Sequence, residues 1–203
     1  MHVIENIIFD LGGVIIDWDP KRLYRKIFKT EKEINYFLEH ICTSDWNELQ
    51  DEGRSLKEAT EVLVNQHPQY QVEIEAFYGR WEEMLGGLIN GTVDLAQQIH
   101  KKGDHKLWAL TNWSAETFPI AEERYHIFDL FDGILVSGKE KLKKPDLKIY
   151  HLLLNRYHLD PENCLFIDDN LRNIKAAKSL GIHSHHFKNV ANLRQALIEY
   201  KIL

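Results

Sequence analysis

One aspartate stands where a short apolar run gives way to glycine. The run 7–9 (Ile-Ile-Phe) precedes Asp10, and Gly12 and Gly13 follow it. Such a run is typical of a strand buried on both faces, and open α/β sheets bind ligands at the carboxyl ends of their strands. Glycine lets the backbone turn tightly and bring its amides close to an anion. The stretch predicts a nucleophile beside an anion site, and a solvated Asp-Gly turn is the alternative interpretation.

A hydroxyl and an amide follow a second apolar run. Residues 107–110 lead directly into Thr111 and Asn112, and the spacing after them predicts a helix over 114–125. These side chains, together with free amides at a helix N-terminus, would make an anion site. Ordinary helix capping by Thr111 or Ser114 explains the same residues without a ligand.

A pair of acids follows a third apolar run. Residues 165–167 lead into Asp168 and Asp169, ahead of a helix expected at 171–180. Two adjacent carboxylates at a buried strand end repel each other, and a divalent cation relieves that repulsion. An acidic cap for the following helix is the alternative interpretation.

One lysine of the basic run 139–144 differs from the others. Lys144 precedes Pro145, which stiffens the chain, and Asp146, which opens a helix. A single ordered ammonium near several acids can neutralise both the acids and a bound phosphate. The other lysines of the run are expected on a solvated loop.

The elements that must position these residues fall into two patterns. Between residues 20 and 85 all the spacing is helical, with a last helix expected at 72–85, which makes a block about the size of a small bundle. From residue 88 onward helices alternate with short apolar runs, the first of these helices being capped by Thr92. This alternation predicts a parallel sheet covered on both faces.

The two patterns together predict an α/β fold with an insertion. We expect a doubly wound parallel sheet, a Rossmann-like core, to be formed by residues 1–17 and 88–203. An all-helical cap, residues 18–87, would then be inserted after the first strand.

Composition narrows the class of protein. The chain has 203 residues and a formal net charge of −6, so no global basic field draws it to nucleic acid or to a membrane surface. No apolar run approaches the roughly 20 residues that a membrane span needs, and no export leader is seen. Cys42 and Cys164 lack metal-type spacing, which favours a reducing, cytoplasmic setting. The oligomeric state is left open.

The four motifs occur in the order Asp10, Thr111, Lys144-Pro145 and Asp168-Asp169, with the helical block between the first two. In this order and arrangement the chain resembles the haloacid dehalogenase (HAD) superfamily of hydrolases over essentially its whole length. The stretch 53–59 (Gly-Arg-Ser-Leu-Lys-Glu-Ala) is similar to the cap of the phosphatase branch that includes bacterial glucose-1-phosphatases and the N-terminal domain of soluble epoxide hydrolases.

The resemblance implies a role for each motif. Asp10 would attack phosphorus and form an aspartyl-phosphate that water hydrolyses, and Lys144 would pair with the phosphate and with Asp10. The phosphate would be held by Thr111, Asn112 and the backbone of Gly12 and Gly13. Mg²⁺ would be bound by the Asp10 carboxylate, the Gly12 carbonyl, Asp169 and, directly or through water, Asp168. Because Trp113 directly follows Asn112, we expect it to line the substrate pocket, with core packing as the alternative.

One position departs from the family's pattern. Phosphatases of the family usually carry a second aspartate two residues after the nucleophile as general acid and base, and here that residue is Gly12. General acid–base catalysis is worth about 10²–10⁴-fold. Asp17, Asp19, Glu48 or another residue of the cap are the candidates to replace it.

The sequence thus predicts a Mg²⁺-dependent phosphatase of small phosphorylated metabolites, with sugar phosphates as the first expectation. A metal-independent 2-haloacid dehalogenase is one alternative, because such enzymes also lack the second aspartate; however, they generally lack the acidic pair found at Asp168-Asp169. A protein that binds a phosphorylated ligand or a partner with little turnover is the other alternative.

Overall fold

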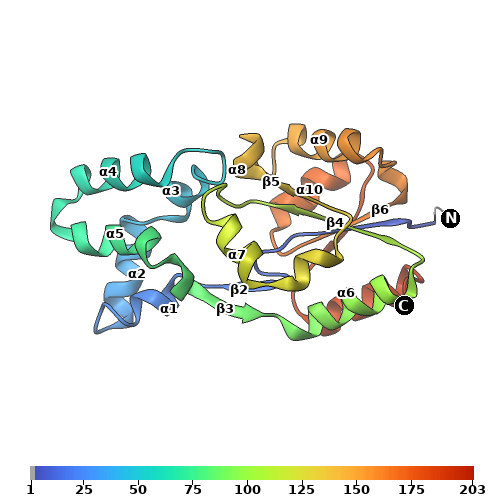
Figure 1. The fold of residues 1–203 in the computed structure, drawn as a ribbon, viewed down its shortest axis with the longest axis horizontal. Coiled ribbons are helices and arrows are strands. Elements are labelled where there is room, and N and C mark those ends of the chain that lie inside the picture. Colours follow the sequence, from blue (N-terminus) through green and yellow to red (C-terminus); the bar gives the residue numbers. More distant parts are fainter. Residues whose placement is uncertain (1–2) are drawn as a thin grey trace.

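A five-stranded parallel sheet forms the centre of the computed structural model, which describes residues 3–203 (Figure 1). The strand order is β5-β4-β1-β6-β7. The strands are β1 (Asn6–Phe9), β4 (Lys106–Thr111), β5 (Gly133–Val136), β6 (Cys164–Asp168) and β7 (His183–His186). The first strand in the chain is therefore the middle strand of the sheet, flanked by the two strands that carry the other polar motifs.

The two faces of the sheet are buried under different helices. Ile7 and Phe9 belong to one apolar cluster, and Ile8 between them belongs to a second cluster on the opposite face. The first cluster includes residues of α6 (Asn90–Lys102) and α11 (Val190–Glu199), and the second those of α9 (Leu147–Tyr157) and α10 (Leu171–Ser179). Ile7, Ile8 and Phe9 are all fully buried. This arrangement confirms the predicted doubly wound α/β core.

Residues 21–84, called the cap segment below, contain only helices and lie at one end of the sheet (Figure 1). Tyr24, Phe37 and Phe77 form its aromatic centre, and Thr30 and Ser55 cap the helices that follow them. Its elements are α1 (Lys21–Tyr24), α2 (Glu31–His40), α3 (Ser44–Glu48), α4 (Leu56–Gln66), η1 (Pro68–Tyr70), α5 (Gln71–Gly79) and η2 (Trp81–Met84). That residues 18–87 form a separate domain stays a prediction.

Two short strands join the cap segment to the sheet. β2 (Ile16–Trp18) and β3 (Leu85–Leu88) pair antiparallel, with Ile16 opposite Leu88. The helix expected at 72–85 therefore ends at Gly79, and Leu85 is part of a strand. Local propensity could not show this, because Gly86 and Gly87 are poor strand formers and the pairing with β2 decides the conformation.

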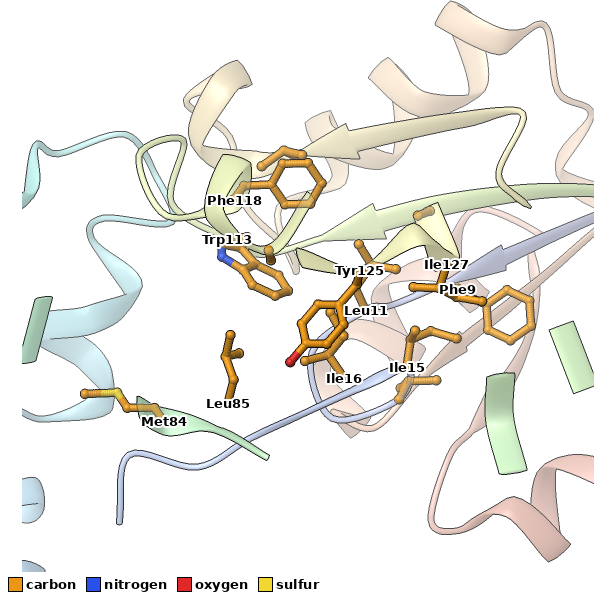
Figure 2. Close-up of a cluster of buried hydrophobic side chains, with 14 of the residues drawn as sticks. Phe9, Leu11, Ile15, Ile16, Met84, Leu85, Trp113, Phe118, Tyr125 and Ile127 are labelled. Atoms are coloured by element: carbon orange, nitrogen blue, oxygen red, sulfur yellow. The ribbon is translucent and has the colours of Figure 1, made fainter. Parts of the chain in front are cut away.

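An apolar cluster continues through this connection without a break (Figure 2). Phe9 and Ile15 lie on the side of the sheet, whereas Met84 and Leu85 lie on the side of the cap segment, and Trp113 stands between the two groups. All five are buried. Shared burial of this kind fixes how the cap segment sits over the strand ends.

The remaining elements are α7 (Phe118–Arg124), η3 (His126–Leu130), α8 (Ser137–Glu140) and η4 (Pro161–Asn163). Two helices begin away from the expected residue: the helix expected at 114 begins at Phe118, and the helix expected at Thr92 begins at Asn90. None of the helices within 3–203 is both long and apolar enough to span a bilayer.

Candidate active site

Three of the four motifs meet at the carboxyl edge of the sheet. Asp10 follows β1 and continues its ladder, since its amide donates to the Ile167 carbonyl at 2.8 Å. Thr111 ends β4 and Asp168 ends β6, the two neighbours of β1. The fourth motif enters from the loop after α8: the Lys144 Nζ lies 2.9 Å from Asp10 Oδ2 and 2.7 Å from Asp168 Oδ2.

The Lys144 ammonium is fully buried and uses all three of its donors. Besides the two carboxylates it donates to the Leu110 carbonyl at 2.8 Å. Burial alone would lower the pKa of Lys144, but the charges of Asp10 and Asp168 raise it above the usual value. The side chain is therefore held as a cation at a fixed point between the first and last motifs.

Asn112 fixes the backbone of that lysine. Its Nδ2 donates to the Lys144 carbonyl at 2.9 Å, and its Oδ1 accepts from the Lys144 amide at 2.8 Å. Both ends of the Asn112 amide are thus engaged in placing Lys144. Its expected contact with a phosphate stays a prediction.

Asp168 is the most completely bonded of the acids. It is fully buried and accepts from Lys144, from the Asn170 amide at 2.7 Å and from Asn173 Nδ2 at 3.0 Å. Sequence reasoning missed Asn173. The signal was present, because Asn173 stands beside Ile174 on the buried face of α10, where a polar side chain needs a partner.

Asp10, Asp168 and Asp169 can offer oxygen ligands that all lie within 4.8 Å of one another. Burial raises the pKa of Asp10 well above its usual range, and the charges of Asp168 and Asp169 raise it further, against the opposing effect of Lys144. Three carboxylates against one ammonium leave an excess of negative charge. A divalent cation with a preference for oxygen ligands fits this group, because it would relieve that excess.

The two glycines after Asp10 differ in their surroundings. Gly13 has a φ of +74°, and a Cβ placed there would overlap the Asp169 carboxylate, so glycine allows that acid to approach the loop. The Gly13 amide already donates to the Ile16 carbonyl at 2.9 Å. At Gly12 an added Cβ would meet no atom of residues 3–203 within 4 Å apart from Gly12 and its two chain neighbours, so the space beside it is open.

Thr111 offers an unused hydroxyl at this edge. The residue is fully buried, and its Oγ1 has no hydrogen-bond partner within residues 3–203. The expected helix N-terminus near Ser114 is absent, because residues 115–117 form a turn and the helix begins at Phe118; just before this turn the Trp113 amide donates to Ser137 Oγ at 2.9 Å. The predicted anion site therefore lacks helix amides and retains the hydroxyl.

A cavity of about 100 Å³ adjoins this edge and opens between the core and the cap segment. Trp113 lines it, with its Nε1 held by Thr117 Oγ1 at 3.1 Å, and also packs against Trp81 in the apolar core; that it contacts a substrate stays a prediction. The cavity is lined by Gly12, Trp18, Asn47, Asp51, Tyr78, Trp81, Asn112, Trp113, Ser114 and Thr117.

The acids proposed as replacements for the missing aspartate lie elsewhere. Asp17 pairs with Arg22, Asp19 accepts from the Lys21 amide at 2.9 Å, and Glu48 pairs with core residues. None of the three lines the cavity. The carboxylate that does so is Asp51, a residue of the cap that the sequence did not single out.

A family model of haloacid dehalogenase-like hydrolases matches residues 4–181. The chain belongs to this family. It is thus a HAD-like hydrolase.

Relatives of this HAD-like hydrolase include two named phosphatases and a solved HAD family enzyme. A sesquiterpene phosphatase of Aspergillus oryzae is 27% identical over 88% of this chain and 87% of its own. A D-ribitol-5-phosphate phosphatase of Bacteroides thetaiotaomicron is 25% identical, covering 96% of this chain and 97% of its own. A HAD family enzyme of B. thetaiotaomicron, solved with magnesium and inorganic phosphate, has a TM-score of 0.72 at 23% identity over 92% of this chain and 95% of that chain. At that identity the likeness shows the fold.

Proposed function

We propose that this HAD-like hydrolase is a Mg²⁺-dependent phosphatase of small phosphorylated metabolites. The observation that carries the proposal is the buried Lys144 between Asp10 and Asp168, with Asp169 beside them. One carboxylate is held next to a fixed cation, and three acids converge where a divalent ion would balance them. A metal-independent dehalogenase would have no use for the acidic pair, whereas phosphoryl transfer needs the charge neutralisation.

Asp10 is the proposed nucleophile. Its Oδ1 accepts from the Leu11 amide at 2.7 Å and its Oδ2 from Lys144, so the carboxylate is oriented before a substrate arrives. It attacks phosphorus, and water then hydrolyses the aspartyl-phosphate. Thr111 Oγ1 supplies a hydroxyl to the phosphoryl oxygens, and Lys144 opposes their charge.

The metal site is proposed at Asp10, Asp169 and the Gly12 carbonyl, with Asp168 next to it. Mg²⁺ bound there would neutralise phosphoryl charge and fix the line of attack. Because Asp168 already accepts from Lys144, Asn170 and Asn173, its main role is to hold Lys144.

The substrate class follows from the cavity. A volume of about 100 Å³ is smaller than the roughly 150 Å³ that accommodates benzene, so the cavity encloses only part of a short, flexible leaving group and has no room for a bulky one. The aromatic walls (Trp18, Tyr78, Trp81 and Trp113) suit the faces of a sugar or a polyol chain. Short sugar and polyol phosphates, such as the substrate named for the B. thetaiotaomicron relative, therefore fit better than a sesquiterpenyl phosphate. The buried free thiols of Cys42 and Cys164 favour a cytoplasmic location.

The test measures phosphate release from p-nitrophenyl phosphate and D-ribitol 5-phosphate, with Mg²⁺ and with EDTA. We expect hydrolysis that EDTA stops and that Asp10→Asn abolishes. Asp17→Asn is the matched control, because it removes a carboxylate of β2 that pairs with Arg22 of α1 and lies outside the cavity. Metal-independent halide release from 2-chloropropionate would instead identify a dehalogenase. Phosphate and Mg²⁺ binding without any turnover would identify a binding protein.

A further inference from the structure

The space beside Gly12, where a second aspartate would project, is open and belongs to a cavity that Asp51 also lines. Apart from Gly12 and its two chain neighbours, no atom within residues 3–203 lies within 4 Å of a Cβ built on Gly12, and Gly12 lines the cavity under the cap segment. Asp51 lines the same cavity from the opposite side of the boundary between core and cap segment. A carboxyl group therefore faces the volume into which an aspartate at Gly12 would project.

The segment around Asp51 is tied to the core on both sides. Three residues before it, Glu48 accepts from Lys143 at 3.3 Å and pairs with Arg172 at 3.0 Å. Directly after it, the Glu52 carboxylate lies 3.4 Å from Lys143 Nζ. Because Lys143 precedes the buried Lys144, these ion pairs hold Asp51 over the strand ends.

The Asp51 carboxyl is partly buried and has no hydrogen bond or ion pair with any of residues 3–203. Burial raises its pKa to about 7, with the charge of Glu48 adding to the shift and those of Lys143 and Lys144 opposing it. The other titratable group facing it is Tyr78, whose own pKa is raised by burial. An acid with a pKa near 7 is suited to give up and regain a proton at neutral pH.

We propose that Asp51 is the general acid and base of this enzyme, delivered from the cap segment in place of an aspartate at Gly12. The proposal rests on the phosphatase function proposed above. In the first step an Asp10 oxygen bonds to phosphorus, the bond from phosphorus to the leaving oxygen breaks, and Asp51 gives its proton to that oxygen. In the second step water attacks phosphorus, the bond to Asp10 breaks, and the Asp51 carboxylate takes the proton of the water.

The experiment compares a leaving group that needs a proton with one that does not. Asp51→Asn should lower kcat/KM for D-ribitol 5-phosphate, or for the best alkyl phosphate of a panel, by about 10²–10⁴-fold. Hydrolysis of p-nitrophenyl phosphate should change little, because p-nitrophenolate leaves without protonation. Asp45→Asn, which removes an exposed carboxylate of α3 outside the cavity, is the matched control and should leave both rates unchanged.

Two further readouts separate a catalytic from a structural role. For the alkyl phosphate, wild-type kcat/KM should fall as the pH rises through the pKa of Asp51, and Asp51→Asn should lack this limb. Adding Gly12→Asp to Asp51→Asn should restore the alkyl phosphate rate, since the open space at Gly12 takes the new side chain.

The possible outcomes either support or overturn the role of Asp51. Selective loss with rescue supports the proposal. Equal loss on both substrates, no loss on either, or a double variant that stays slow while p-nitrophenyl phosphate is still hydrolysed would overturn it. If wild-type protein fails to hydrolyse p-nitrophenyl phosphate in an Asp10-dependent way, the phosphatase function itself fails, which is a different result.

Discussion

An aspartate at the strand ends and an aspartate of the cap segment have opposite surroundings. At the strand ends Asp168 is fully buried and is surrounded by donors from Lys144, Asn170 and Asn173. Across the cavity Asp51 is partly buried and receives no donor from residues 3–203. Donors stabilise a carboxylate in its charged form, whereas burial without donors favours the protonated form.

This difference separates two tasks that a phosphatase needs at once. The core keeps its charges fixed, so that Asp10 and Lys144 are oriented before phosphate arrives. The cap segment keeps one proton available where the leaving group would lie. An aspartate at position 12 would combine both tasks in one loop, next to three acids that would disturb its titration.

The largest effect should come from removing the central cation. Lys144→Met leaves the buried carboxylates of Asp10 and Asp168 uncompensated, so we expect a loss of about 3–5 kcal/mol in the free energy of unfolding together with loss of phosphatase activity. Urea denaturation and p-nitrophenyl phosphate hydrolysis measure the two losses.

Lys143→Met is the matched control for this variant. Its ammonium pairs with Glu48 and Glu52 near the surface, where the side chain is 20% exposed, and it should cost at most about 1 kcal/mol. Equal costs for the two lysine variants would mean that the strand ends hold their charges no more tightly than the cap segment does.

The next largest effect is expected for Asp51→Asn, which should raise the free energy of unfolding instead of lowering it. Its pKa is about 7 in the folded state and about 4 when unfolded, so the folded state binds more protons between these values and the free energy of unfolding falls as the pH rises through this window. Asp51→Asn has no carboxyl group at this position, so its free energy of unfolding does not fall in this way as the pH rises. Allowing for partial exposure, we expect the variant to be more stable than wild type by roughly 1–3 kcal/mol at pH 8 and by little at pH 4.5.

Urea denaturation of both proteins at the two pH values measures this difference, with Glu52→Gln as the control that removes an exposed neighbouring carboxylate. A variant that is slower on alkyl phosphates and more stable at pH 8 is what a destabilised catalytic group produces. A variant that is less stable at both pH values would show that Asp51 is a structural residue.

The strand ends were predictable from sequence, whereas the cap side of the cavity was not. Asp10, Thr111 and Asp168 each follow an apolar run, and parallel strands bring their carboxyl ends to one edge. Asp51 stands among other acids in a helical stretch, and nothing local distinguishes it from Glu48 or Glu52. Its surroundings are made by residues far away in the chain, so only the tertiary fold shows that it lines the cavity.

Two local features were mispredicted for the same reason. The helix expected from Ser114 begins at Phe118, because the side chain of Ser137 on α8 accepts from the Trp113 amide and fixes the chain just before the turn at 115–117. Leu85 lies in β3, because β2 offers a pairing partner. In both cases a distant partner overrides the local preference.

A substitution of Thr111 can separate its proposed role in binding phosphate from its role in core packing. Thr111→Val keeps the shape and removes a buried hydroxyl that has no partner within 3–203, so the free energy of unfolding should be unchanged or higher by up to about 1 kcal/mol. Inhibition by inorganic phosphate should weaken by about tenfold, the worth of one hydrogen bond to a charged group.

Thr117→Val is the matched control, because Thr117 Oγ1 accepts from Trp113 Nε1 and its loss leaves a buried indole donor unpaired. It should cost about 1–3 kcal/mol in the free energy of unfolding and leave phosphate inhibition unchanged. The reverse pattern, a stability loss only for Thr111→Val, would remove Thr111 from the proposed phosphate site.

The smallest effect should come from the ion pairs that hold the segment around Asp51. Glu48→Gln weakens the contacts with Lys143 and Arg172 and should cost at most about 1 kcal/mol, less at high salt. It also removes a negative charge that raises the pKa of Asp51, so the alkaline limb for alkyl phosphates should move to lower pH. Arg172→Gln breaks one of these ion pairs but keeps the Glu48 charge, and it should not move the limb in that direction. Equal shifts in both variants would mean that the position of the segment, and not the charge of Glu48, sets the proton affinity of Asp51.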